Sequence, residues 1–389
     1  MSAKVDAGSA GIAPGVDPLY IGLMSGTSLD GVDAVLAQFP EKHDSGAIRV
    51  LASSHLDFDA DFRNELLEFN HPGTNETHRN ALAANAIARL YSAAIEQLLD
   101  GIAPSVRHAV AAVGAHGQTV RHRPGEFDGC GYTVQLLNGA LLAELSGLNV
   151  VCDLRSRDVA AGGQGAPLVP AFHQAVFHRP GRDTQVVNIG GISNISLLGD
   201  TVKGFDCGPG NCLMDLWIQR HLGQAFDAGG QWAAQGQVLP ALLEAMWATP
   251  FFHQAPPRST GRDLFNAAWL DGLLHDGHAQ AAPVDVQATL AELTARAIGT
   301  SVPAQGGGID AVLLVCGGGA FNTHLLQRLQ ALLPLRKVLS TDTQGLPAME
   351  VEAAAFAWLA QRFMAGLSGN LPSVTGAKGP RVLGALYPA

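Results

Sequence analysis

Residues 20–34 combine small, hydroxylated and acidic side chains in a pattern suited to holding phosphate. An apolar run, residues 19–24, ends in the turn Ser25-Gly26-Thr27-Ser28, and an apolar pattern resumes after Leu29-Asp30-Gly31. This predicts two strands joined by a tight turn. Glycines there let the backbone approach a ligand, and hydroxyls beside free N–H groups could hold phosphate oxygens or a bridging metal ion. An ordinary Gly/Ser hairpin turn has the same composition, so this segment alone leaves both interpretations open.

Two further glycine turns follow apolar strands. Gly190-Gly191 comes after residues 185–189, and Gly317-Gly318-Gly319 comes after residues 312–315. With the turn at Gly26, they indicate a nucleotide whose phosphates are held by both halves of the chain. The alternative is that each glycine relieves crowding at a strand end. No turn matches the P-loop, because no Gly-Lys-Ser/Thr follows, and none has the dinucleotide-binding spacing.

Asp206 is the candidate general base. It follows an apolar strand and precedes Gly208-Pro209-Gly210 and a helix start. A carboxylate at the edge of a cleft could accept a proton there. Aspartate is also a common helix N-cap, and position alone leaves both roles open.

Other polar side chains stand near the ends of strands in the first half. They are His116, Gln118, Arg155, Asp158 and Gln164. Together they could bind a polar, acidic small molecule, with Arg155 facing a carboxylate. Arg155 and Asp158 could equally form a structural ion pair. Glu352 lies on an Ala-rich helix, where it is either solvated or part of a stretch that is otherwise buried.

The elements that must position these residues alternate between strand and helix, which predicts an α/β fold. The length of 389 residues and the 47% hydrophobic content suggest two domains. Each half begins with strand, glycine turn and strand, a weak repeat. With the charged turn at residues 178–183 as the boundary, we expect one domain at 19–182 plus 369–389 and another at 183–368. Residues 1–18 are expected to be a disordered tail.

Composition excludes several classes of function. The net charge is −10 and no basic patch stands out, which argues against partners such as nucleic acid or an anionic membrane. The five cysteines have no disulfide-framework or zinc spacing, which favours a cytoplasmic location. No apolar run is long enough to span a bilayer. The oligomeric state stays open, a homodimer included.

The chain resembles the anhydro-N-acetylmuramic acid kinase family from Tyr20 to Pro388. The resemblance is carried by the motifs Met24-Ser25-Gly26-Thr27-Ser28-Leu29-Asp30-Gly31, His116-Gly117-Gln118-Thr119, Gly163-Gln164-Gly165-Ala166-Pro167-Leu168-Val169-Pro170, Asn188-Ile189-Gly190-Gly191, Phe205-Asp206-Cys207-Gly208-Pro209-Gly210-Asn211 and Cys316-Gly317-Gly318-Gly319-Ala320-Phe321-Asn322. It implies two ribonuclease-H-like domains around a central cleft, as in the superfamily of sugar kinases, heat-shock ATPases and actin.

The resemblance also implies roles for residues. ATP phosphates would be held by Gly26, Thr27, Ser28, Leu29, Asp30, Gly31, Val32 and Asp33. Gly317, Gly318 and Gly319 would lie near the nucleoside, and Gly190 and Gly191 belong to the same nucleotide site. Asp206 matches the catalytic aspartate. The expected amino-sugar site comprises His116, Gln118, Arg155, Asp158, Gly208, Asn211 and Glu352. Mg²⁺ is expected with ATP, and its protein ligands are not assigned.

The implied reaction belongs to peptidoglycan recycling. It uses ATP and water to open the 1,6-anhydro ring of 1,6-anhydro-N-acetylmuramic acid and to phosphorylate O6, giving N-acetylmuramic acid 6-phosphate. One alternative is another sugar or carboxylate kinase of the same superfamily. A second is an ATP-driven binding module without catalysis, which the sequence disfavours because no separate peptide-binding domain follows the second half.

Overall fold

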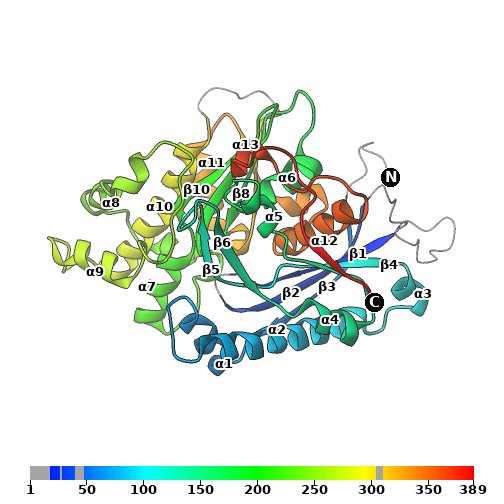
Figure 1. Cartoon of the computed structure of the whole chain (residues 1–389). Helices are drawn as coiled ribbons and strands as arrows, with labels where there is room; N and C mark the ends of the chain where they lie inside the picture. Colours follow the sequence, from blue (N-terminus) through cyan, green and yellow to red (C-terminus); the bar gives the residue numbers. More distant parts are fainter. Residues whose placement is uncertain (1–17, 27–28, 40–47, 304–309) are drawn as a thin grey trace. The chain divides into compact units, whose positions relative to one another are not determined.

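The computed structural model describes residues 18–26, 29–39, 48–303 and 310–389 and contains two compact units (Figure 1). The first unit comprises the described residues up to Leu168 together with residues 352–389, and the second comprises Val169–Val351. Both boundaries lie earlier in the chain than the expected ones. The reason is the packing of the two connecting helices, which sequence reasoning had placed in the opposite units.

Helix α6 (Val169–Phe177) belongs to the second unit, where Nδ1 of His173 and Oγ of Ser196 form a 2.9 Å hydrogen bond. Helix α12 (Val351–Met364), apart from its first residue, belongs to the first unit. Its backbone at Ala353 lies directly against Gly22 of the central strand. Each helix therefore belongs to the unit whose sheet it contacts.

The first unit is built on a six-stranded sheet in the order β13-β7-β4-β1-β2-β3. The strands are β1 (Leu19–Met24), β2 (Gly31–Gln38), β3 (Arg49–Asp57), β4 (Val110–Ala115), β7 (Val150–Cys152) and β13 (Ala385–Tyr387). β1, β2 and β3 are antiparallel, whereas β4 is parallel to β1 and β7 is parallel to β4. The predicted hairpin of β1 and β2 is confirmed.

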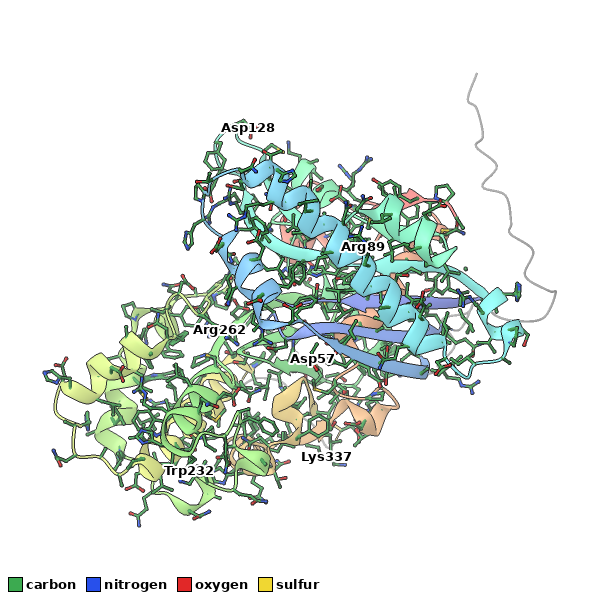
Figure 2. The ribbon with its side chains drawn as sticks, turned by 90° about the horizontal axis from the view of Figure 1, so that it is seen from below. Asp57, Arg89, Asp128, Trp232, Arg262 and Lys337 are labelled. Carbon is green, nitrogen blue, oxygen red and sulfur yellow. The ribbon has the colours of Figure 1, made fainter. Side chains whose placement is uncertain are left out.

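Burial explains these strands and their helices. Every residue of β1 is buried, as expected for a central strand covered on both faces, whereas β3 at the edge alternates in exposure. The long helix α2 (Glu76–Leu99) lies along β2 and β3 and buries a stripe that includes Ile87, Tyr91 and Ile95 (Figure 2, where Arg89 marks α2 and Asp57 the end of β3). Apolar residues at helical spacing over residues 77–99 predict this helix from the sequence alone.

The second unit has a five-stranded sheet in the order β10-β9-β8-β11-β12. Its strands are β8 (Thr184–Ile189), β9 (Ile192–Leu197), β10 (Lys203–Pro209), β11 (Val312–Cys316) and β12 (Lys337–Ser340). β8, β9 and β10 are antiparallel, and β11 is parallel to both β8 and β12. This repeats the order β3-β2-β1-β4-β7 of the first unit. Three antiparallel strands followed by two parallel ones form a ribonuclease-H-like sheet, so the predicted α/β fold class is confirmed.

Further helices surround these two sheets. They are α1 (Ala60–Glu68), α4 (Gly139–Ser146), α5 (Ser156–Ala160), α7 (Cys212–Leu222), α8 (Pro240–Trp247), α9 (Ala267–His275), α10 (Pro283–Ser301) and α11 (Thr323–Leu332). A separate ribbon pairs β5 (Gln118–Pro124) with β6 (Gly131–Leu136). Among the described residues, none of the helices is both long and apolar enough to cross a membrane.

Candidate active site

The turn after β1 is fixed to the core at Ser25. The Ser25 hydroxyl is 2.8 Å from the hydroxyl of buried Tyr91 and donates to the carbonyl of Gly117 at 3.2 Å. The Leu29 N–H donates to the Gly26 carbonyl at 3.2 Å, which closes the turn. Thr27 and Ser28, two of the predicted phosphate-binding residues, lie outside the described residues.

Two glycines near this turn have a packing explanation. A methyl group added at Gly22 would lie 1.8 Å from the Ala353 carbonyl oxygen, and one added at Gly31 would lie 2.3 Å from the Leu56 carbonyl oxygen. Contacts with α12 and β3 therefore already require glycine at both positions, and the role of Gly31 in binding a ligand stays a prediction. Leu29 and Val32 have buried side chains, so only their backbone could meet a phosphate.

Asp33 is held by a histidine on the neighbouring strand. Its Oδ1 is 2.7 Å from Nδ1 of His55, and Nε2 of the same ring is 3.2 Å from Oδ1 of Asp57. The two carboxylates raise the pKa of His55 above its ordinary value, against the opposing effect of burial. Sequence reasoning missed His55, because only the pairing of β2 with β3 brings it opposite Asp33.

Glu352 stands in the first turn of α12 and is partly buried. Burial raises the pKa of Glu352, the nearby Asp33 carboxylate raises it further, and Arg155 lowers it. The first unit thus brings together two carboxylates and one guanidinium that are far apart in the sequence.

His116 and Arg155 form a buried pair. The backbone carbonyl of Ser25 lies 3.1 Å from Nδ1 of His116, and Arg155 donates to Nε2 of the same ring from Nε at 3.1 Å. The His116 ring is therefore neutral, with its proton on Nδ1. Burial and the neighbouring Arg155 lower the pKa of His116 to about 3. Arg155 also donates to the Gly165 carbonyl at 2.8 Å, which orients its guanidinium.

Asp158 does not form an ion pair with Arg155, so the structural alternative suggested by the sequence is wrong in that form. Its carboxylate is fully buried and accepts from Asn370 Nδ2 at 2.6 Å, Thr375 Oγ1 at 2.7 Å and the Gly165 N–H at 2.8 Å. It ties the loop before α6 to the C-terminal segment. Asp158 thus has a structural role, and its contact with substrate stays a prediction.

Gln118 is also fully buried, and its amide nitrogen donates to the carbonyls of Gly26 at 3.1 Å and Thr119 at 3.3 Å. Its Oε1 is buried without a hydrogen-bond partner among the described residues. Gln118 thus links the β1 turn to the start of β5. Gln164 has an exposed side chain, and its N–H donates to the Thr375 carbonyl at 2.7 Å.

In the second unit, Asp206 lies inside β10, and the register with β9 shifts between Asp206 and Gly208. The N-cap of α7 is Asn211, so the alternative that Asp206 caps this helix is wrong. The Asp206 Oδ2 accepts from the Thr260 N–H at 2.9 Å and from Ser259 Oγ at 3.0 Å. Burial raises the pKa of Asp206, while these two donors and Arg258 lower it.

The Gly190-Gly191 turn is bound to the start of α7. The Gly190 carbonyl accepts from the Asn211 N–H at 2.8 Å, and the Gly191 carbonyl accepts from the Gly210 N–H at 2.9 Å. Asn211 also donates from Nδ2 to the Ile189 carbonyl at 3.1 Å. Gly208, expected in the substrate site, has a packing explanation, because an added methyl group would lie 2.7 Å from the Phe252 ring.

A cavity of about 390 Å³ adjoins the third glycine turn. It is lined by Asn211, Met214, Asp215, Phe226, Asp227, Gly229, Gly318, Phe321, Asn322 and Met349. Gly319 is packed against Ile189, but a methyl group at Gly318 would meet nothing closer than 3.5 Å. Sequence reasoning found Asn211 and Gly318. It missed Met214 and Asp215, which lie on α7, and Phe226, Asp227 and Gly229, which lie in the segment after that helix, where the sequence has no strand or helix pattern.

Two ribonuclease-H-like units, glycine turns after their strands and a half-buried carboxylate in β10 define a protein of the sugar kinase and actin-like class. The family model described as anhydro-N-acetylmuramic acid kinase matches residues 18–389. The chain belongs to this family.

Relatives support the same assignment. A protein named anhydro-N-acetylmuramic acid kinase from Variovorax paradoxus (strain S110) is 59% identical over 379 residues, covering 95% of this chain and 99% of that one. One of the same name from Albidiferax ferrireducens is 54% identical over 393 residues, with the same coverage.

Solved structures resemble the chain distantly: the (R)-2-hydroxyglutaryl-CoA dehydratase component A of Acidaminococcus fermentans aligns with a TM-score of 0.43 and 13% identity, over 87% of this chain and 96% of that one.

Proposed function

We propose that this chain uses ATP and water to convert 1,6-anhydro-N-acetylmuramic acid into N-acetylmuramic acid 6-phosphate. The observation that carries the proposal is the family match over residues 18–389, which includes the strand that holds Asp206. Relatives that are more than half identical over almost their whole length bear the name of this kinase.

The substrate chemistry requires a base that acts on water. In the anhydro sugar O6 is bonded to C1, so O6 has no proton to lose. Asp206 accepts a proton from water, the water oxygen bonds to C1, and the C1–O6 bond breaks with its electron pair on O6. O6 then takes the γ-phosphoryl group, and ADP leaves with the electrons of the broken P–O bond. A pKa of Asp206 raised by burial brings the carboxylate closer to the pH at which a general base works best.

The nucleoside of ATP is assigned to the cavity beside Gly318. Its volume lies in the range of about 300–1,000 Å³ typical of small-molecule sites. Met214, Phe226 and Phe321 offer apolar surface for a base, and the Asp215 carboxylate also lines the cavity. Gly318 supports this assignment because packing within the protein does not require a glycine there.

By the family resemblance, the turn at residues 26–33 of the first unit and the Gly190-Gly191 turn of the second unit are each proposed to bind phosphate oxygens. The first turn is fixed by Ser25, and its end carries Asp33. Asp33 and Glu352 are the carboxylates of the first unit that would suit Mg²⁺, because this cation prefers oxygen ligands. Bound Mg²⁺ would neutralise charge on the phosphates.

The carboxylate of the amino sugar is assigned to Arg155. Each terminal nitrogen of a guanidinium carries two N–H groups, so NH1 and NH2 of Arg155 each keep one after donating to Gly165 and His116. Burial lowers the pKa of Arg155 to about 10, so it remains charged at neutral pH. A carboxylate ligand would pair with a cation that the fold has already oriented.

The test is an assay of ADP formation with ATP, Mg²⁺ and the anhydro sugar, with mass spectrometry of the sugar product. The expected product is the anhydro sugar plus one water and one phosphoryl group. Turnover of glucose or acetate, but not of the anhydro sugar, would instead favour another kinase of the superfamily. Asp206→Asn should bind an ATP analogue as the parent protein does and lose turnover by a factor of about 100 or more. Near-normal turnover would remove Asp206 from the mechanism.

A further inference from the structure

The segment Arg258–Thr260 is bound to both the backbone and the side chain of Asp206. The Asp206 N–H donates to the Arg258 carbonyl at 3.1 Å, and Arg258 Nε donates to the Asp206 carbonyl at 3.0 Å. Ser259 and Thr260 donate to the Asp206 Oδ2. The surrounding residues 254–266 have no strand or helix pattern in the sequence, and the sequence alone gives this segment no function.

Arg258 is itself held from several directions. Its NH1 donates to the carbonyls of Phe252 and Gln254, each at 3.1 Å, and its NH2 donates to Ser301 Oγ on α10 at 3.1 Å. The guanidinium carbon lies 5.7 Å and 5.1 Å from the ring centroids of Phe205 and Phe251. Such a cation, with four of its five N–H groups hydrogen-bonded and with aromatic rings beside it, is a rigid support rather than a free binding group.

The two oxygens of Asp206 therefore differ. Oδ2 accepts two hydrogen bonds, whereas Oδ1 accepts none from the residues that the structure describes. A carboxylate oxygen with two donors is a poorer proton acceptor than its partner, because its lone pairs are engaged. The register shift in β10 after Asp206 is of the kind that re-aims a side chain from a strand.

We propose that Ser259 and Thr260 fix Oδ2 of Asp206 as a hydrogen-bond acceptor, so that Oδ1 takes the proton from water, and that Arg258 holds this segment in place. Ser259, Thr260 and Arg258 are positioning residues for the base. The inference rests on the proposed function: the water O–H bond breaks, its proton goes to Oδ1, and the water oxygen bonds to C1. The charged and titratable groups that face Asp206 here are Arg258 and the adjacent Cys207.

The test variant is Ser259→Ala, because Ser259 is exposed and its loss removes one donor without disturbing the core. The expected result is a kcat lower by about tenfold with unchanged KM values for ATP and sugar. The acid limb of the pH profile should move to higher pH, because the lost hydrogen bond favours the ionised carboxylate. Ser259→Thr keeps a hydroxyl donor, so its kcat and the acid limb of its pH profile should match those of the parent protein. Thr201→Ala, which removes an exposed hydroxyl from the turn between β9 and β10, is the matched control.

A second measurement separates this inference from the proposed function. The carboxyl carbon of Asp206 can be followed by ¹³C NMR in protein labelled at aspartate, with the resonance assigned from Asp206→Asn. The pKa of Asp206 should rise in Ser259→Ala even if the anhydro sugar is not the substrate. An unchanged titration, or an unchanged kcat and acid limb in an enzyme that does phosphorylate the sugar, would overturn the inference.

Discussion

Gly22 of β1 and Gly114 of β4 are register partners on neighbouring parallel strands, and both lie under the same helix. Methyl groups added there would meet backbone carbonyl oxygens of α12, at 1.8 Å from Ala353 and 2.0 Å from Phe356. The helix that carries Glu352 therefore sits directly on the sheet, and these two glycines make its close approach possible.

Gly22→Ala should destabilise the protein by about 3 kcal/mol, because backbone atoms on both sides must move apart. Urea unfolding would measure the loss. Gly272→Ala is the matched control, since a methyl group on α9 meets nothing within 4 Å and replaces a helical glycine. That variant should gain about 0.5–1 kcal/mol. Equal stability of the two variants would contradict the assigned packing of α12.

Gly318→Ala should leave the stability of the protein almost unchanged and weaken the binding of nucleotide. Its added methyl group meets no close neighbour, so the free energy of unfolding should change by less than about 0.5 kcal/mol. The methyl group would occupy part of the cavity assigned to the nucleoside, so the Kd for an ATP analogue should rise about tenfold or more. Calorimetric titration of the folded variant measures this. Unchanged affinity would place the nucleoside elsewhere.

Asp206→Asn should stabilise the protein at neutral pH. Since burial raises the pKa of Asp206 above its ordinary value of 3.8, the fold disfavours the ionised form, and stability falls as the pH rises from that value through the raised pKa. Asparagine removes this cost and can still accept from Ser259 and Thr260. Unfolding measurements at pH 7 and near pH 3 should show an advantage at pH 7 that fades in acid. A variant less stable than the parent at pH 7 would refute this linkage.

His116 should make the protein sensitive to acid. Its pKa falls from an ordinary 6.5 to about 3 in the fold, so below pH 6.5 the unfolded chain takes up a proton that the folded protein does not. Stability is therefore lost as the pH falls from 6.5 towards 3, by up to about 1.4 kcal/mol per pH unit. His116→Gln should flatten this slope, and the exposed His78→Gln serves as the control. A slope unchanged by His116→Gln would show that the imidazole is protonated in the folded protein.

The sequence predicted elements better than it predicted contacts. The β1–β2 hairpin and α2 follow from apolar patterns within one segment. Asp206 was found because it follows an apolar run, although β10 continues past it to Pro209. The hydrogen bond from Ser259 to Asp206 joins residues 53 positions apart, so no local pattern could reveal it. For the same reason the sequence suggested an ion pair between Arg155 and Asp158, whereas in the structure Arg155 donates a hydrogen bond to the His116 ring.

The most direct test of the central claim is one turnover in ¹⁸O-labelled water, followed by mass spectrometry of fragments of the sugar phosphate. If a water activated by Asp206 attacks C1, the label enters at C1, and the oxygen that bridges C6 and phosphorus is unlabelled. Label in that bridging oxygen would mean that water attacked C6 instead, and it would contradict the proposed mechanism.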